Sequence, residues 1–162
     1  MTNGRPVCIF TAMAADRPSP AALREMQGCV CFALRRTSRV VTQFYEAALR
    51  PHRLRATQFP ILVAASEEQA LPLAPLAESL GMDRTTLLRN VRPLVRRGLL
   101  DVVTPSGSRR TLVRATAAGR ALLARVYPAW RRAQARALRS LEGVDWPGTL
   151  DALSRLPRSG AR

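Results

Sequence analysis

The residues best suited to recognition chemistry are the arginines between positions 84 and 110. This stretch holds seven arginines and one acidic residue, Asp101. Arginine can donate paired hydrogen bonds to guanine or to a phosphate, asparagine can pair with adenine, and threonine can contact a thymine methyl group or a phosphate. Exposed helices without a binding role normally mix both signs of charge. The stretch therefore favours contact with a polyanion over the plainer interpretation, a solvated charged face.

On a helical wheel the segment from Asp83 to Arg97 divides into two faces. Five apolar residues share one face: Leu87, Leu88, Val91, Leu94 and Val95. The helix start and the polar side carry the residues that we select as DNA contacts, which are Arg84, Thr85, Thr86, Arg89, Asn90 and Arg96. Pro93 lies on the exposed side and predicts a bend after Arg89. Such a helix would bury its apolar face and present the other face to base edges and phosphates.

A β-hairpin is predicted directly after this helix. Strands are expected at 99–103 and 109–115, with TPSGS as the turn between them. Gly107 permits a positive φ at the tip. Ser108, Arg109 and Arg110 beside it are expected to approach the adjacent minor groove, which attracts arginine where it is narrow. An ordinary basic hairpin is the alternative interpretation.

The remaining pattern predicts helices around this module. A helix is expected over 21–50, ended by Pro51. Others are expected from Thr57 as N-cap, with Pro60 in the first turn; from Pro75 to Gly81; from Thr116 as N-cap to about 141, kinked at Pro128; and near 149–156, with a short strand at 71–73. The fold class is therefore mostly α with a small β-hairpin wing, a winged helix-turn-helix with a helical dimerisation region.

The domain organisation follows from these elements. Residues 1–20 are expected to form a flexible arm and 157–162 a tail, while 57–115 form the DNA-binding domain. Residues 21–56 and 116–156 are assigned to dimerisation, because the first helix is apolar on two sides and therefore needs more than one partner surface. The helix after the hairpin is expected to contribute apolar residues to the same interface: Leu122, Leu123, Val126, Tyr127, Trp130 and Leu138.

Composition narrows the function classes. The formal net charge of the 162 residues is +15, and all 26 basic residues are arginine, a surplus that favours polyanions. The sequence offers no signal peptide and no apolar run of the ~18 residues that span a bilayer, so a cytoplasmic protein without membrane contact is expected. The spacing of His52 with Cys8, Cys29 and Cys31 makes no zinc site. No enzymatic motif and no cofactor-binding motif is found, so neither an enzyme nor a cofactor is expected.

At this point the chain resembles the MarR (multiple antibiotic resistance regulator) family of bacterial transcription factors, over roughly Gly28 to Ser140. The most telling segments are LGMDRTTLLRNVRPLVRRGLL and SRRTLVRATAAGRALL. The resemblance implies a homodimer with interlocked terminal helices, two winged modules on a palindromic operator, and a crevice for a small-molecule effector. Wings of this family often read Asp-Arg-Arg, whereas this chain has Ser108-Arg109-Arg110, so an aspartate that would brace the wing arginine is missing.

A narrower resemblance lies in CFALRRTSRVVTQFYEAAL, which is similar to the first helix of the organic-hydroperoxide regulators (OhrR) of that family. It implies that Cys31 is an oxidisable sensor and that Tyr45 is one of the tyrosines that hold its thiolate. Arg35 and Ala56 stand where two further tyrosines would be. Arg35 places a cation one turn from Cys31, and a nearby cation favours a thiolate. The alternative is that both Cys29 and Cys31 are small buried hydrophobic residues.

Two functions of different classes remain. The first is a sequence-specific transcriptional regulator, a repressor released by a small ligand or by thiol oxidation. The second is an architectural or non-specific DNA-binding protein, which would not distinguish operator from random DNA.

If Cys29 and Cys31 share one helix, they lie about 200° apart around its axis and cannot bond to each other without unwinding it. An intersubunit disulfide is then the remaining pairing.

Overall fold

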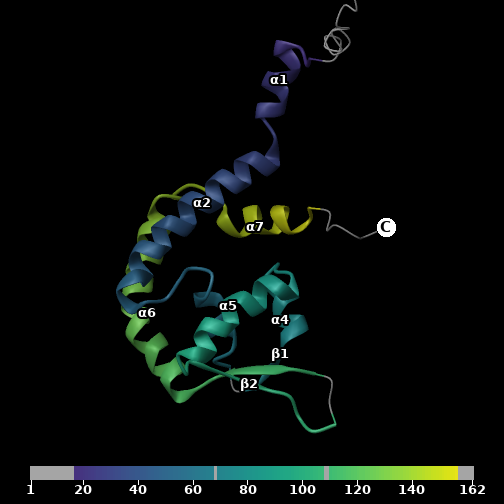
Figure 1. Cartoon of the computed structure of the whole chain (residues 1–162). Coiled ribbons are helices and arrows are strands. Elements are labelled where there is room, and N and C mark those ends of the chain that lie inside the picture. The colour runs from purple at the N-terminus through teal and green to yellow at the C-terminus, as the bar shows by residue number, and fades with distance from the viewer. Residues whose placement is uncertain (1–16, 68, 108–109, 157–162) are drawn as a thin grey trace, which may run out of the picture. The chain divides into compact units, whose positions relative to one another are not determined.

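The computed structural model describes residues 17–67, 69–107 and 110–156 (Figure 1). The chain divides into two compact units, residues 1–41 and residues 42–162, which are described separately. Within the described residues the structure is mostly helical and has one small antiparallel sheet, which confirms the expected fold class. None of the described helices is both long and apolar enough to cross a membrane.

The single helix predicted over 21–50 is wrong. The segment forms α1 (Pro20–Gln27) and α2 (Val30–Leu49), followed by the short 3-10 helix η2 (Arg50–His52). Ser19 caps α1 by accepting a hydrogen bond from the backbone N–H of Ala22, so Ser19 and Pro20, which the prediction assigned to the arm, belong to this helix and its cap. The backbone N–H of Gly28 closes α1 on the carbonyl of Glu25. Glycine is a poor helix former, and the chain uses this position to end one helix and begin another.

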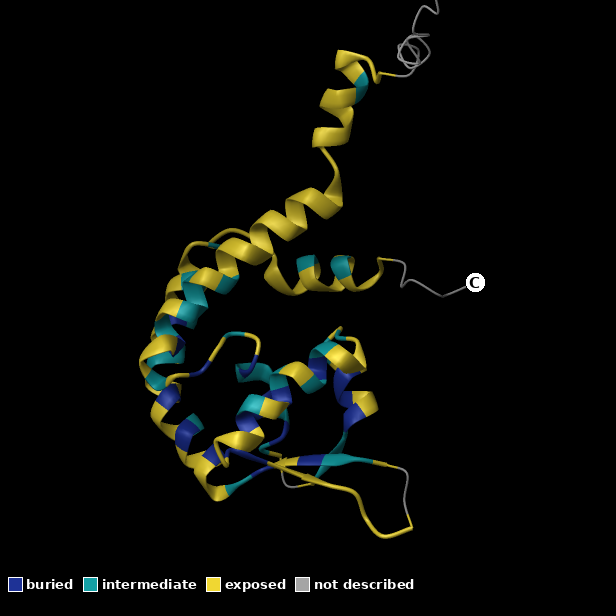
Figure 2. Cartoon of the chain, viewed as in Figure 1, coloured by how far each residue is buried: buried dark blue, intermediate teal, exposed yellow. Residues whose placement is uncertain are grey.

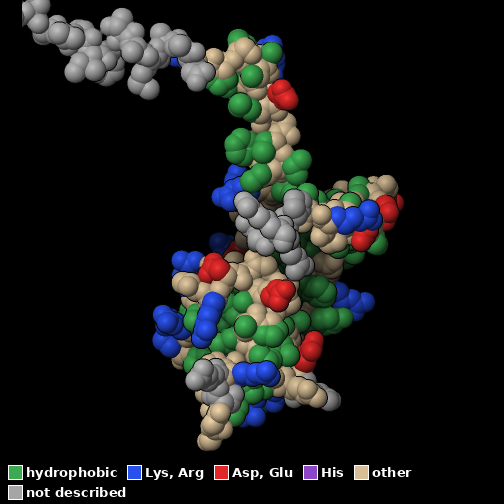
Figure 3. Space-filling model, turned by 90° about the vertical axis from the view of Figure 1, so that its right-hand side faces the viewer, with side chains coloured by type: hydrophobic (Ala, Val, Ile, Leu, Met, Phe, Trp, Pro, Cys, Tyr) green, Lys and Arg blue, Asp and Glu red, His purple; other side chains and the backbone are tan. Residues whose placement is uncertain are grey.

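Residues 17–41 expose most of their apolar side chains. Phe32 is 64% exposed and Val40 is 60% exposed, and Figure 3 shows apolar side chains in green along this unit. Figure 2 shows the same residues almost entirely as exposed. Several large apolar side chains exposed within one short segment are typical of an interaction site. The unit therefore has apolar surface that its own residues do not cover.

The core lies within residues 42–156. It is built by the C-terminal end of α2, by α3 (Phe59–Ala64), α4 (Leu73–Ser79), α5 (Arg84–Arg96) and α6 (Ala117–Arg139), and by the sheet. Figure 2 colours the buried residues of this unit dark blue. The largest fully buried side chains are Leu49, Leu54, Ile61, Leu62, Leu87, Leu94, Leu100, Val91, Val113 and Val126. α7 (Trp146–Ser154) contributes no residue to this core.

Two predicted contributors to the subunit interface belong to this core instead. Leu122 and Val126 on α6 are buried within the chain, so assigning them to a partner surface was wrong. Trp130 is half-buried and stacks against Phe59 of α3. Tyr127 and Leu138 are exposed, and their role in a subunit interface stays a prediction.

Several helix starts differ from the prediction. Thr57 does not cap α3, which begins two residues later with Pro60 in its first turn as expected. Pro75 is the third residue of α4, a position whose backbone N–H has no partner inside the helix in any case. The last helix begins at Trp146 because Asp145 caps it through the N–H of Gly148. The predicted caps Asp83 and Thr116 are confirmed.

The sheet has three short strands in the order β1-β3-β2, all antiparallel. β1 (Leu71–Pro72) pairs with β3 (Leu112–Ala115), which also pairs with β2 (Leu100–Val103). Leu100 lies opposite Ala115, and Val103 lies opposite Leu112. The pairing of β2 with β3 is the predicted hairpin, with shorter strands than expected. β1 fixes the inner edge of this hairpin to the segment that leads into α4.

Gly119 allows α6 to pass close to the start of the hairpin. A Cβ atom at this position would lie 2.2 Å from the carbonyl oxygen of Leu99 and 3.2 Å from Cδ1 of Leu62. No side chain can be accommodated at the first distance unless the backbone moves. Glycine at 119 is therefore required by the packing of α6 against the hairpin.

Candidate nucleic-acid interface

Packing fixes which face of α5 is presented to solvent. Leu87, Val91 and Leu94 are at most 1% exposed, and Leu88 is half-buried. Val95, which was expected on the packed face, is instead 37% exposed. On the other side the selected side chains Arg84, Thr85, Arg89 and Arg96 are exposed, and so is Arg92, which was not selected. The helix thus exposes a stripe of arginines that contains no acidic residue.

The N-terminus of α5 is capped by Asp83. Its Oδ1 atom accepts a hydrogen bond from the backbone N–H of Thr86 at 2.8 Å, and its Oδ2 atom accepts one from the Thr86 hydroxyl at 2.7 Å. The first of these bonds, and then the second, lower the pKa of the Asp83 carboxyl because they stabilise its charged form. The Thr86 hydroxyl also accepts a long hydrogen bond, 3.4 Å, from Nη2 of Arg89. Thr86 therefore connects the cap to the central arginine of the exposed stripe.

Asn90 is bonded at both ends of its amide. Its Nδ2 atom donates to the carbonyl oxygen of Thr86 at 2.9 Å, and its Oδ1 atom accepts from the hydroxyl of Thr57 at 2.8 Å. One amide N–H remains for a further partner. The base contact that the sequence suggests for Asn90 stays a prediction, and in this structure the side chain braces α5 against the segment before α3.

Residues 50–58, which we call the connector, join α2 to α3 and contact α5 at two points. Besides the bond from Thr57 to Asn90, Nη1 of Arg97 donates to the carbonyl oxygen of Arg53 at 2.5 Å. On the α2 side, Oε1 of Glu46 accepts from the backbone N–H of Ala56 at 3.0 Å. Sequence reasoning missed all three bonds, because each joins positions ten or more residues apart without a local motif.

The hairpin brings one predicted arginine close to α5. Gly107 has a φ of 74°, as expected for the tip, whereas Ser108 and Arg109 lie outside the described residues. Arg110 is exposed, and it lines a hollow together with Arg84 and with Pro72, Leu73 and Thr111. The start of α5 and the second half of the hairpin thus present arginines to one site.

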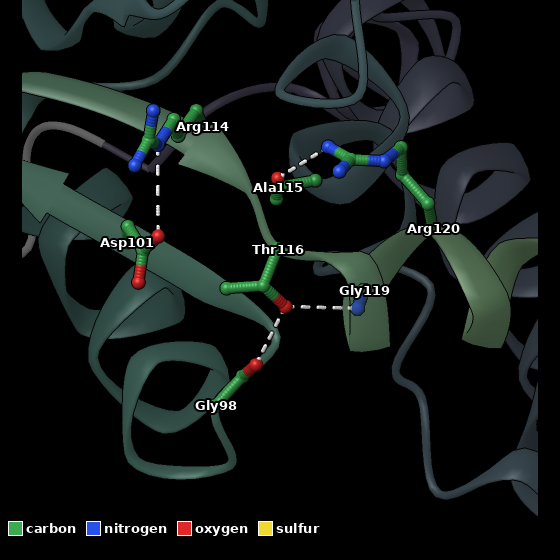
Figure 4. Close-up of polar contacts among 7 residues, drawn as sticks. All are labelled: Gly98, Asp101, Arg114, Ala115, Thr116, Gly119 and Arg120. Atoms are coloured by element: carbon green, nitrogen blue, oxygen red, sulfur yellow. Dashed lines mark hydrogen bonds and ion pairs between the residues drawn. The ribbon is translucent and has the colours of Figure 1, made fainter.

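The base of the hairpin is held by polar contacts that Figure 4 shows as dashed lines. The hydroxyl of Thr116 donates to the carbonyl oxygen of Gly98 at 2.7 Å and accepts from the backbone N–H of Gly119 at 3.0 Å. Nη1 of Arg120 donates to the carbonyl oxygen of Ala115 at 2.7 Å. Across the strands, Arg114 and Asp101 lie 3.6 Å apart and are both exposed, so this ion pair contributes little stability.

The cysteines are not placed as the packing interpretation requires. Cys29 and Cys31 are both exposed free thiols, so reading them as residues buried within the chain was wrong. The expectation that they share one helix was also wrong, because Cys29 precedes α2 and Cys31 is its second residue. Cys8 lies outside the described residues. Within the described ranges, no group of three or more His, Cys, Asp or Glu side chains is placed to hold a metal ion.

Tyr45, the predicted partner of a sensor cysteine, is engaged within its own unit. Its hydroxyl donates to Oε1 of Gln134 on α6 at 2.5 Å, and its ring lies edge-on to Phe44. Burial raises the pKa of Tyr45 because it disfavours the phenolate. Tyr45 therefore joins α2 to α6, and a contact with a thiolate of another subunit stays a prediction.

Comparisons with known proteins place this arrangement among transcriptional regulators. No family model and no curated protein sequence matches the chain. The M. tuberculosis transcriptional regulator MosR in complex with DNA superposes with a TM-score of 0.69 at 35% identity, over 79% of this chain and 92% of that one. A MarR-family regulator from Rhodococcus sp. RHA1 gives 0.61 at 27% identity, over 84% and 92%. CouR from Rhodococcus jostii RHA1, bound to p-coumaroyl-CoA, gives 0.61 at 28% identity, over 80% and 88%.

The cap of α5 gives a prediction for the titration of Asp83. Because the folded pKa lies below the ordinary value of 3.8, the cap stabilises the helix above that pH, and this contribution is lost as the pH falls below it. Carbon-13 NMR should place the midpoint of the Asp83 carboxyl titration below 3.8. Thr86→Val removes the hydroxyl bond and keeps the backbone bond, so it should raise the midpoint part of the way.

Thr85→Val is the matched control, because no hydrogen bond from the Thr85 hydroxyl to Asp83 is among the causes of the shift. It should leave the midpoint where it is. Equal shifts in the two variants would show that the Thr86 hydroxyl does not stabilise the carboxylate.

Proposed function

This chain belongs to the MarR family of winged helix-turn-helix transcriptional regulators, and we propose that it is a homodimeric repressor that binds a palindromic operator. The observation that carries the proposal is the acid-free stripe of exposed arginines on α5, opposite a face that is fixed in the core. The regulator MosR, which shares 35% of its residues with this chain, was crystallised with DNA. In each half-site, α5 enters the major groove and the hairpin approaches the neighbouring minor groove.

The proposed DNA contacts have different tasks. Arg89, with Thr85 and the remaining N–H of Asn90, reads base edges, while Arg84, Thr86 and Arg96 lie where they can contact bases or the backbone. Arg110 contacts the backbone together with its neighbours Ser108 and Arg109. Because Arg84 and Arg110 line one hollow, a phosphate can be held between helix and hairpin. Contacts to base edges give sequence preference, whereas contacts to the DNA backbone give position and affinity.

Replacing Arg89 by alanine should weaken operator binding by roughly 1–3 kcal/mol and relax the preference at one base step. Arg109→Ala and Arg110→Ala should instead weaken binding to all sequences alike. They should reduce the slope of log affinity against log salt by about one for each phosphate that the variant no longer neutralises. Fluorescence anisotropy with operator and random duplexes over a range of salt concentrations measures both effects.

The same titrations test the alternative function. A non-specific or architectural protein would bind operator and random DNA with equal affinity, and Arg89→Ala would leave that ratio unchanged. If a variant with Arg89, Arg109 and Arg110 all replaced by alanine bound the operator as tightly as the wild type does, the assignment of this face to DNA would be wrong.

The proposal of a dimer rests on the apolar surface of the terminal helices. Leu23, Met26 and Phe32 of α1 and α2 are exposed, as are Tyr127, Leu138 and Leu150 of α6 and α7. Burial of ~2,000 Å² at ~25 cal/mol per Å² would suffice to hold an obligate dimer. Sedimentation equilibrium at micromolar concentration should therefore find a dimer, whereas a folded monomer would exclude an obligate dimer.

Two means of release are proposed. CouR is bound to p-coumaroyl-CoA, and this chain has a hollow between α2 and α6 whose apolar wall includes Phe44 and Ala48. His52, Arg132 and Arg136 line the same hollow. It suits a small ligand with an apolar body and a negative charge. The second means is oxidation of Cys31, which is next to Phe32 in the helix assigned above to the dimer interface, so that its oxidation would alter that interface.

Organic hydroperoxide should weaken operator binding by the wild type more than by Cys31→Ser. The hydroperoxide would oxidise the Cys31 thiolate to a sulfenic acid and itself become an alcohol, and a second thiol would then displace water to form a disulfide. A bond or added bulk close to a dimer interface changes the spacing of the two DNA-binding domains. Cys29→Ser and Cys8→Ser are the controls, and they should still form the sulfenic acid. Equal responses in the wild type and Cys31→Ser would eliminate Cys31 as the sensor and leave a ligand in the hollow as the better explanation.

A further inference from the structure

A second hollow lies beside α5, on the side of the connector. It is lined by Arg55 and Gln58 from the segment before α3 and by Arg89, Asn90, Arg92, Pro93 and Arg96 of α5. Four guanidinium groups thus border one depression, and no carboxylate does. Sequence reasoning did not select Arg55 or Arg92. Arg55 lies outside α5, and Arg92 only flanks the polar face of that helix.

The arginines of this hollow have few partners within the described part of the chain. Arg55, Arg92 and Arg96 make no side-chain hydrogen bond or ion pair there, and Arg89 makes only the long bond to Thr86. Two other arginines are held by acceptors instead: Arg97 donates to the carbonyl oxygen of Arg53 and Arg120 to that of Ala115. Guanidinium groups donate in a planar fork that matches the oxygens of phosphate. The hollow therefore offers several unused donors to one anion.

The wall of the hollow is held in place by its own backbone contacts. Gln58 is 6% exposed, and its Oε1 atom accepts from the backbone N–H of Arg55 at 3.2 Å. The carbonyl oxygen of Arg55 in turn accepts from the backbone N–H groups of Gln58 and Phe59. The bond from Thr57 to Asn90 joins this wall to α5. Arg55 thus projects from a fixed backbone, at a fixed place relative to Arg92.

We propose that this hollow binds a backbone phosphate of DNA through Arg55 and Arg92, with Arg96 at its edge. The inference rests on the proposed function, since it takes α5 to lie in the major groove. Arg89 borders the hollow and also belongs to the stripe that faces the bases, so a phosphate in the hollow lies next to the base contact. The connector, and not only the helix and the hairpin, then sets the position of α5 on the duplex.

The test is a salt titration with Arg55→Ala, Arg92→Ala and the double variant. Each single variant should weaken binding to operator and to random DNA by the same factor, so that their ratio is preserved. The slope of log affinity against log salt, taken between about 50 mM and 200 mM, should fall by about one per half-site in the double variant, which leaves the phosphate without either guanidinium, and by less in each single variant. Arg55→Lys should keep the slope, because it keeps the charge. The exposed Arg125 on α6 lines no part of this hollow, and Arg125→Ala should change neither quantity.

A scan of operators that carry one neutral methylphosphonate each locates the phosphate. One position per half-site should weaken wild-type binding, and at that position Arg55→Ala should weaken binding no further. Circular dichroism of Arg55→Ala should match the wild type, since the side chain is exposed.

The outcomes distinguish a failure of this inference from a failure of the proposed function on which it rests. An unchanged salt slope in the double variant of Arg55 and Arg92, with Arg89→Ala still losing sequence preference, would overturn the phosphate site and leave the regulator intact. If Arg89→Ala were also without effect, the proposed function would itself be wrong. Calorimetric binding of inorganic phosphate that is abolished in Arg55→Ala, with DNA slopes unchanged, would show a site for free phosphate and overturn the assignment to the DNA backbone.

Discussion

The burial of one face of α5 constrains the rest of the interface. Leu87, Val91 and Leu94 are sealed in the core, so a rotation of the helix would expose them and bring an arginine inside. A buried charge without a partner costs several kcal/mol, far more than any single surface contact of this helix contributes. The core therefore determines that Arg89, Arg92 and Arg96 face outward together, and the surface that they would offer to DNA follows from packing and not from the arginines alone.

Packing sets the rotation of α5, and polar tethers set its place relative to neighbouring segments. The bonds from Thr57 to Asn90 and from Arg97 to Arg53 join the helix to the connector, and Glu46 joins the connector to α2. A neutral hydrogen bond contributes only about 0.5–1.5 kcal/mol, so the tethers do not determine the fold. They do limit the positions that α5 can take, and a binding surface held in place loses less entropy when a ligand arrives. These bonds also give a physical route by which a change at α2 can reach α5.

The sequence predicts the features that depend on neighbouring residues and misses those that depend on distant ones. Asp83 and Thr116 are confirmed as caps because cap and helix are read within four residues. Thr57 has the same chemistry, yet its hydroxyl bonds to Asn90, and no local pattern shows this. Leu122 and Val126 fit an interface or a core equally well by spacing, and only the folded chain places them in its core. The arginine stripe follows from helical periodicity, whereas Arg55 joins it only in three dimensions.

Positive charge is not confined to the module that the sequence assigns to DNA. α6 carries six arginines and no acidic residue along its 23 positions. In a dimer of the proposed kind, the association of two such helices brings like charges together, and apolar burial must exceed their repulsion. Over distances beyond the Debye length of about 8–10 Å, salt screens that repulsion at physiological ionic strength. Bound DNA adds a dense negative charge that offsets it further. Any residual field that opposes the pairing of two copies would also attract the duplex, so in such a dimer bound DNA would favour the association of the subunits.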